Sequence, residues 1–227
     1  MTIPVIAARG LGVGHGARPF VTGLDLEVHP GEIVALLGAN GAGKSTTLLG
    51  LAGALAAQEG HVELRGRTVR SALHRRAQQG LGFITQQRCV FMGLTARDNL
   101  RAGGVDPGRA VEAFPELRPH LGRTVGLLSG GQQQMLAVAR AIARKPDVLL
   151  ADELSLGLAP LVVDRILGAL RTACIEDGLG LLLVEQQVPK ALAVADRVVV
   201  LRRGKIALEG PVADVRGRLD DLQDLYL

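Results

Sequence analysis

Apolar residues fill several short segments of the chain at successive positions, without alternating with polar residues. These segments are residues 31–38, 147–152, 179–184 and 197–201. Uninterrupted apolar runs of this length are typical of strands that are buried on both faces, as in a parallel sheet covered by helices. Residues 161–174 and 188–195, which lie between the later runs, fit the crossover helices that such a sheet requires. The pattern therefore predicts an α/β fold.

Other parts of the chain follow different patterns. Residues 2–30 and 61–70 alternate more like half-exposed antiparallel strands, whereas residues 95–144 are mostly helical in pattern. We expect an antiparallel β subdomain beside the parallel core, and a helical lobe inserted into it.

The length of the chain fits one domain. Its 227 residues, 48% of them hydrophobic, can bury a sizeable core without a second one. We expect a single domain over residues 1–227. Residues 1–86 and 147–227 would form a nucleotide-binding core with the β subdomain, and residues 87–146 the helical subdomain.

A glycine-rich loop follows the first apolar run. Gly38 to Ser45 match the pattern GxxxxGKS, with a predicted strand before it and a predicted helix after it. In a P-loop of this kind the backbone N–H groups and the helix N-terminus bind phosphate, Lys44 neutralises the β- and γ-phosphates, and Ser45 ligates Mg²⁺. The alternative is a glycine-rich turn without a ligand. The predicted ATP-binding residues are Gly38, Asn40, Gly41, Gly43, Lys44, Ser45 and Thr46.

The apolar run 147–152 ends in Asp152, and a second acidic residue, Glu153, follows it directly. Asp152 would lie beside the Mg²⁺, and Glu153 could polarise the attacking water as a general base. Paired acids at the end of a strand are also common as helix caps or solvated turns. Together with the P-loop they predict ATP hydrolysis.

The segment Leu128-Ser-Gly-Gly-Gln132 precedes a long predicted helix. Ser129 is a suitable N-cap, and the two glycines leave the backbone amides uncovered. This helix end could bind an anion, although an ordinary capped helix explains the same residues.

Taken together, these motifs resemble the ATPases of ABC transporters, because LSGGQ lies between a P-loop and the segment LLADE. The resemblance covers almost the whole chain and implies a P-loop NTPase fold of the ABC ATPase type. It also implies a head-to-tail dimer that encloses two ATP molecules. The residues expected to complete the partner's site are Ser129, Gly130, Gly131 and Gln132.

The resemblance implies roles for two further loops. Gln86 matches the glutamine that senses Mg²⁺ and the membrane subunit, although an exposed polar loop residue is the simpler explanation. Residues 155–160 match the loop that crosses the dimer interface.

Three positions depart from the family pattern. His15 stands where an aromatic residue, usually Tyr, stacks on adenine; an imidazole can still stack, and a plain turn residue is the alternative. Gln186 replaces the switch histidine and can hydrogen-bond a γ-phosphate without carrying charge, which implies slower or more strictly coupled hydrolysis. Leu154 replaces a proline, which leaves the stiffness of the turn after Glu153 open.

Within this family, the segments LSGGQQQMLA, DELSLGLAP and LLVEQQ look like the shorter ATPase of branched-chain amino-acid importers. The resemblance implies a motor subunit at the cytoplasmic face of the cell membrane. Its partners would be a second ABC ATPase subunit, transmembrane permease subunits and, indirectly, an extracytoplasmic solute-binding protein. Since specificity resides in those partners, the solute assignment is only an analogy.

Other functions stay open at this point. They are an importer for another solute such as urea or amides, an exporter, a soluble ABC ATPase of DNA repair or translation, and a regulatory module that binds nucleotide without hydrolysis. The chain shows neither the coiled-coil insertions nor the second cassette that soluble ABC ATPases normally carry.

Composition changes this picture little. The net charge of +4 could favour nucleic acid, but the basic residues are scattered and only 2% of residues are aromatic, so we expect no nucleic-acid partner. No apolar run reaches the roughly 20 residues of a membrane span, and the N-terminus does not look like a secretory signal. Cys89 and Cys174 are expected to be free thiols.

Overall fold

A six-stranded, mainly parallel sheet forms the centre of the computed structural model, which describes residues 2–87 and 89–216. Its strand order is β10-β9-β3-β8-β7-β6, and only the pairing of β10 with β9 is antiparallel. The strands are β3 (Ile33–Leu37), β6 (Leu81–Ile84), β7 (Val148–Asp152), β8 (Gly180–Val184), β9 (Arg197–Arg202) and β10 (Lys205–Pro211). Every residue of β3, β7 and β8 is buried, as their uninterrupted apolar runs predict.

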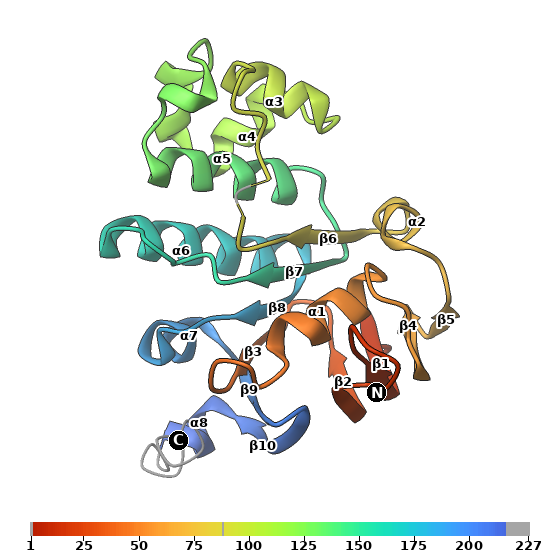
Figure 1. Ribbon diagram of the computed structural model, residues 1–227. Helices are drawn as coiled ribbons and strands as arrows, with labels where there is room; N and C mark the ends of the chain where they lie inside the picture. Colours follow the sequence, from red (N-terminus) through yellow and green to blue (C-terminus); the bar gives the residue numbers. More distant parts are fainter. Residues whose placement is uncertain (1, 88, 217–227) are drawn as a thin grey trace.

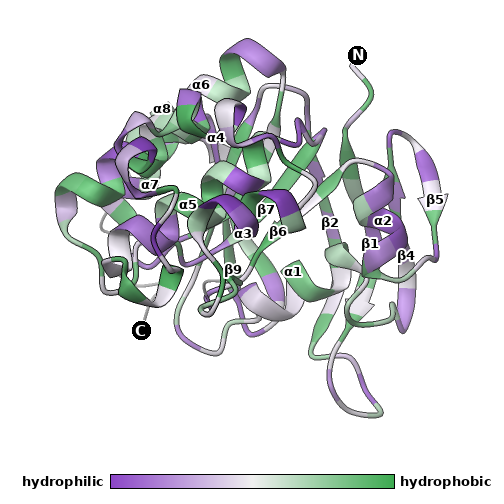
Figure 2. Ribbon diagram, turned by 90° about the horizontal axis from the view of Figure 1, so that it is seen from above, coloured by the Kyte–Doolittle hydropathy of each residue, from purple (hydrophilic) through white to green (hydrophobic). Residues whose placement is uncertain are grey.

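Helices cover both faces of this sheet. They are α1 (Lys44–Ala52), α2 (Leu73–Gln78), α6 (Pro160–Asp177), α7 (Val188–Val194) and α8 (Val212–Arg216). In Figure 1, α1 lies on the opposite side of the sheet from α6. Figure 2 shows hydrophobic residues along the central strands and hydrophilic residues over most of α2. None of the helices within the described ranges has both the length and the apolarity that crossing a bilayer requires.

A second, antiparallel sheet packs beside α1 in the order β2-β1-β4-β5. Its strands are β1 (Ile6–Val13), β2 (Val21–Val28), β4 (Glu59–Leu64) and β5 (Arg67–Val69). The predicted alternation holds for β2 but was wrong for β1, in which six of eight residues are buried because β1 lies between β2 and β4 and packs into the core. The α/β fold class with an antiparallel sheet is confirmed.

Residues between β6 and β7 are mostly helical, as expected. The segment contains α3 (Ala96–Ala102), α4 (Pro107–Ala113), α5 (Gly130–Ile142) and two 3₁₀ helices, Pro115–His120 and Val125–Leu127. They pack around the fully buried side chains of Leu100, Phe114 and Leu117. In Figure 1 they form a layer beyond β6 and β7, on the far side of the sheet from α1.

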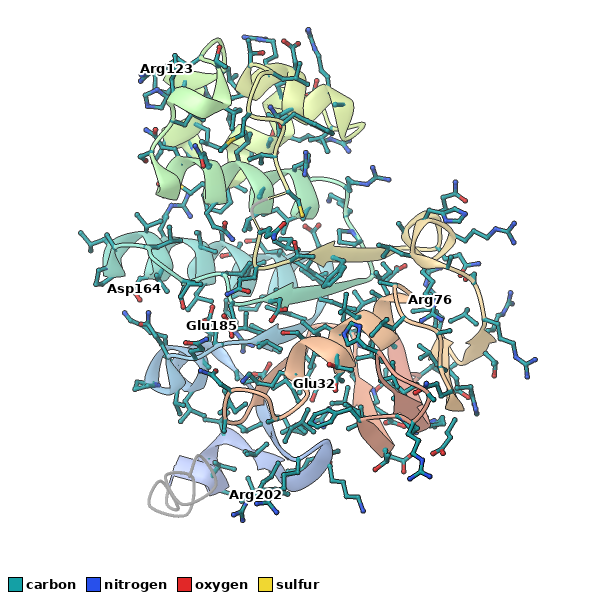
Figure 3. The ribbon with its side chains drawn as sticks, viewed as in Figure 1. Glu32, Arg76, Arg123, Asp164, Glu185 and Arg202 are labelled. Carbon is teal, nitrogen blue, oxygen red and sulfur yellow. The ribbon has the colours of Figure 1, made fainter. Side chains whose placement is uncertain are left out.

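The end of α1 is held by a buried arginine. Arg76, only 4% exposed, donates hydrogen bonds to the carbonyls of Leu51 at 2.7 Å, Gly50 at 3.2 Å and Ser71 at 2.8 Å (Figure 3). Carbonyls at a helix C-terminus lack partners inside the helix, so this guanidinium satisfies two of them. The N-terminus of α1, by contrast, opens onto the glycine-rich loop.

Candidate active site

The loop between β3 and α1 brings Lys44 into the protein. Lys44 is 6% exposed, and its Nζ donates to the carbonyls of Gly38 at 2.7 Å and Ala39 at 3.0 Å. Burial lowers the pKa of Lys44, and the nearby carboxylates of Glu153 and Asp152 oppose that shift. Gly38 has φ +143°, and a Cβ there would lie 2.3 Å from the Leu201 carbonyl oxygen, so only glycine fits. The loop thus holds the Lys44 ammonium against two backbone carbonyl oxygens.

Asp152, the last residue of β7, lies beside the start of α1. Ser45 hydrogen-bonds to its carboxylate, while its Oδ1 is buried and has no partner among the described residues. Burial raises the pKa of Asp152, since an ionised carboxylate with an unsatisfied oxygen is costly away from water. A hydroxyl and a carboxylate oxygen are the donors that Mg²⁺ prefers, so these two residues fit that ion.

Two glutamines hold the carboxylate of Glu153. Gln86 Nε2 donates to its Oε2 at 3.0 Å, and Gln186 Nε2 donates to its Oε1 at 2.8 Å. The backbone of Glu153 adopts the left-handed conformation, with φ +49°, and its N–H donates to the Val184 carbonyl at 2.9 Å. The structure therefore brings Gln86, Glu153 and Gln186 together from three separate loops.

A cavity of about 160 Å³ joins the loop to Glu153. Its lining consists of Phe20, Asn40, Gly41, Gly43, Lys44, Ser45, Thr46 and Glu153. Sequence reasoning missed Phe20, although an aromatic residue in the turn that also contains His15 was a usable signal. The Phe20 side chain lies against Gly43 and is 48% exposed, whereas His15 is an exposed residue outside this lining.

The glycine-rich segment before α5 lies elsewhere in the chain. Ser129 caps α5: its Oγ accepts from the Gln132 N–H at 3.2 Å, and the Gln132 Oε1 accepts from the Ser129 N–H at 3.0 Å. The predicted N-cap is confirmed. Gly130 and Gly131 form the first turn of α5, which Figure 1 shows across the sheet from α1. One chain does not bring these residues to its own phosphate loop.

Comparison with known proteins decides the family. Residues 21–155, more than half of the chain, match the family model described as ABC transporter. The chain belongs to the ABC transporter family. Its ATPase fold agrees with a solved dimeric ATP-binding cassette bound to ADP and phosphate, at 25% identity and a TM-score of 0.79 over 91% of this chain and 98% of that one.

Curated members of the ABC transporter family resemble this chain over most of its length. The high-affinity branched-chain amino acid transport ATP-binding protein BraG of Pseudomonas aeruginosa is 39% identical over 198 residues, which is 82% of this chain and 83% of BraG. The lipopolysaccharide export system ATP-binding protein LptB of Escherichia coli is 32% identical over 225 residues, 92% of each chain. As an ABC ATPase, the protein binds and hydrolyses ATP.

The burial of Asp152 generates a prediction about stability. Because its pKa is raised in the folded state, the stability linked to its proton is present at low pH and is lost as the pH rises through the folded-state value. Asp152→Asn should therefore raise the melting temperature of the ligand-free protein at neutral pH. It should also remove the part of the ATP-induced stabilisation that depends on Mg²⁺, measured by thermal unfolding with and without the ion.

A matched control is Asp147→Asn, at the opposite end of β7, where the carboxylate pairs with Arg65. That variant should keep the Mg²⁺-dependent stabilisation. A lower melting temperature for Asp152→Asn, or an unchanged response to Mg²⁺, would contradict the assignment.

Proposed function

We propose that this protein is the ATP-hydrolysing motor subunit of an importer for branched-chain amino acids. The observation that carries the site assignment is the convergence of Gln86, Glu153 and Gln186 beside Lys44 and Asp152. The similarity to BraG supports the solute class. An exporter is the second candidate, because LptB is similar over more of the chain at lower identity.

Nucleotide binding begins at the loop between β3 and α1. The γ-phosphate would draw the Lys44 ammonium from the carbonyls of Gly38 and Ala39, exchanging two neutral acceptors for a charged one. The hydroxyl and amide groups of Ser45 and Thr46 at the start of α1 would complete the phosphate contacts. Phe20 offers the base or the ribose an exposed aromatic face, in addition to His15.

Ser45, Asp152 and Gln86 would together hold Mg²⁺. When bound, the ion neutralises charge on the phosphates. Among the described residues the Asp152 Oδ1 has no hydrogen-bond partner, which supports this assignment because a buried oxygen is left that could coordinate a cation.

Hydrolysis would use Glu153 as the general base. Both of its oxygens accept hydrogen bonds from glutamine amides, which occupy the carboxylate. If Gln86 turns toward the metal site and Gln186 toward the γ-phosphate, the carboxylate becomes free to accept a proton from the attacking water. Gln186 cannot itself relay a proton, so its role is to orient.

The active form would be a head-to-tail pair of ABC ATPase subunits. Ser129, Gly130, Gly131 and Gln132 would complete the partner's site, because the Ser129–Gln132 capping box uses the amide of Gln132 and not those of Gly130 and Gly131, which suit an anion. Residues 87–146 would act as a helical subdomain that moves against residues 1–86 and 147–227. The dimer would dock at the cytoplasmic face of the membrane on permease subunits that receive solute from an extracytoplasmic binding protein.

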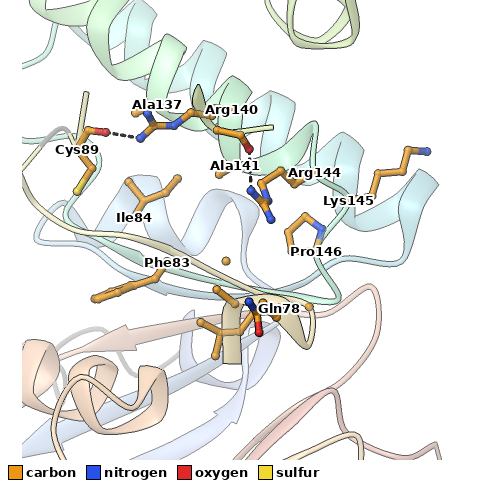
Figure 4. Close-up of a pocket in the computed structure, with 15 residues that line it drawn as sticks. Gln78, Phe83, Ile84, Cys89, Ala137, Arg140, Ala141, Arg144, Lys145 and Pro146 are labelled. Atoms are coloured by element: carbon orange, nitrogen blue, oxygen red, sulfur yellow. Dashed lines mark hydrogen bonds between the residues drawn. The ribbon is translucent and has the colours of Figure 1, made fainter. Parts of the chain in front are cut away.

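A groove between β6 and α5 is our proposed docking site for the permease. This cavity of about 390 Å³, shown in Figure 4, has an apolar wall that includes Phe83, Ile84 and Ala137. Among the described residues that line it, Arg140, Arg144 and Lys145 are basic and none is acidic. The occupant that fits is a cytoplasmic permease segment with apolar residues and a carboxylate.

An apolar patch extends this groove. Arg140 donates to the Cys89 carbonyl, and its guanidinium lies 6.0 Å from the centre of the Phe91 ring. Phe91, Met92 and Leu127 are 56%, 53% and 70% exposed, and the Gly126 N–H donates to the Met92 carbonyl. Phe91 and Met92 follow Gln86 closely in the chain. A partner bound to them would therefore act on the loop that contains Gln86, whose side chain hydrogen-bonds to Glu153.

Lys44→Ala tests the phosphate site. Removing the ammonium should lower kcat/KM for ATP about 100-fold or more, because a charge buried beside the phosphates is lost. Phosphate release at varied ATP concentration measures it, with Lys205→Ala on the edge strand β10 as the matched control. Wild-type activity in Lys44→Ala would overturn the site.

Arg144→Glu tests the docking groove. The reversed charge should weaken binding to the permease at least tenfold, in co-purification from detergent or in a binding titration, and should leave the basal ATPase activity unchanged. Arg202→Glu is the control, since Arg202 is an exposed arginine at the end of β9, well away from α5 (Figure 3). Equal retention of the permease by both variants would rule this surface out.

A further inference from the structure

A buried carboxylate with no role in the mechanism above follows β8. Glu185 is 1% exposed and lies between β8 and α7, where Figure 3 labels it. It accepts hydrogen bonds from the backbone N–H of Ser155 at 3.1 Å, from the Ser155 hydroxyl and from the backbone N–H of Gln186. Both of its oxygens therefore contact Ser155, and the side chain joins the loop after β8 to the loop after β7.

These contacts belong to a series that joins the loops after β7 and β8. The Glu153 N–H donates to the Val184 carbonyl, Ser155 donates to Glu185, and Gln186 donates to the Glu153 carboxylate. Ser155 is itself only 4% exposed. The two loops are thus connected at three successive positions, and Glu185 is the middle one.

A carboxylate is an expensive residue for this position. Burial raises the pKa of Glu185. The hydrogen bonds from Ser155 and Gln186 oppose this shift without cancelling it. A buried polar group with all its donors in place fixes one geometry, whereas an apolar residue of similar size would only fill space. The geometry that these bonds hold is the distance between the turn at Ser155 and the backbone of Gln186.

We propose that Glu185 is a positioning residue that holds Gln186 within reach of Glu153 and makes the position of Gln186 depend on the turn at Ser155. The inference rests on the proposed role of Glu153 in hydrolysis. Leu156, next to Ser155, is 53% exposed, so a second ATPase subunit can reach this turn. Displacement of the turn by that subunit moves Glu185, and Gln186 with it, which couples release of Glu153 to subunit contact.

Ser155→Ala is the first test, because it removes one hydroxyl and keeps the backbone N–H bond to Glu185. It should lower kcat for ATP about tenfold with KM changed less than twofold, since small displacements of catalytic groups reduce turnover more than binding. In a Gln186→Ala background the same substitution should have almost no further effect, because Ser155 acts through Gln186. Ser155→Thr retains the hydroxyl and should restore most of the activity.

The control is Ser71→Ala, which removes a buried hydroxyl between β5 and α2 that has no partner in the part of the chain that the structure describes. It should leave kcat unchanged. If Ser155→Ala lowers only the melting temperature, or if its effect on kcat adds fully to that of Gln186→Ala, Glu185 is merely structural and the inference is wrong.

The same assays separate this inference from the proposed function. If the wild type does not hydrolyse ATP, or if Lys44→Ala remains active, the proposed function fails. If wild type and Lys44→Ala behave as expected while the Ser155 and Gln186 effects are independent, only the positioning role fails. Glu185→Ala repeats the comparison in a second variant, with Glu32→Ala, a carboxylate paired with Arg197 before β3, as its control.

Discussion

The whole site depends on the parallel register of three buried strands. β3, β8 and β7 are neighbours, with Leu36 opposite Val184 and Asp152 opposite Val184, so their carboxyl ends meet at one edge of the sheet. In open α/β sheets, ligand sites form in the crevice outside this edge. The glycine-rich loop follows β3, Asp152 ends β7 with Glu153 directly after it, and Gln186 lies in the loop after β8. A shift of one residue in any of these pairings would separate the groups.

Charge burial connects this arrangement to function. Lys44 and Asp152 both lose solvation in the folded chain. This lowers the pKa of Lys44 and raises the pKa of Asp152, and both shifts favour the uncharged form of the side chain. Glu153 is held by two amides instead of a cation. A triphosphate beside Lys44 and a cation beside Asp152 would each favour the charged form of these groups again.

Sequence alone could predict much of this account. Contiguous apolar runs predicted β3, β7, β8 and β9, and a buried strand ending in an acid, together with the glycine-rich loop, predicted that Ser45 and Asp152 lie close together. Periodicity could not predict the antiparallel edge strand β10 or the burial of six of the eight residues of β1, because both depend on which neighbours cover a strand. Phe20 and Glu185 were missed for a similar reason, because their places in the site depend on contacts between distant residues. Phe20 lies against Gly43, and Glu185 contacts Ser155 thirty residues away. Leu154, which stands in place of the expected proline, packs in the core at 2% exposure.

In the proposed dimer, this chain would supply half of an ATP site which a second subunit completes. Glu153→Gln keeps the shape of the side chain but cannot accept a proton from water, so ATP should bind and remain intact. The molecular mass of this variant should then rise from one subunit to two when ATP is added, measured by light scattering after gel filtration, either with itself or with its partner ATPase. Lys44→Ala in the same background should abolish the change. A Glu153→Gln protein that retains ATP yet stays a single subunit would contradict the account.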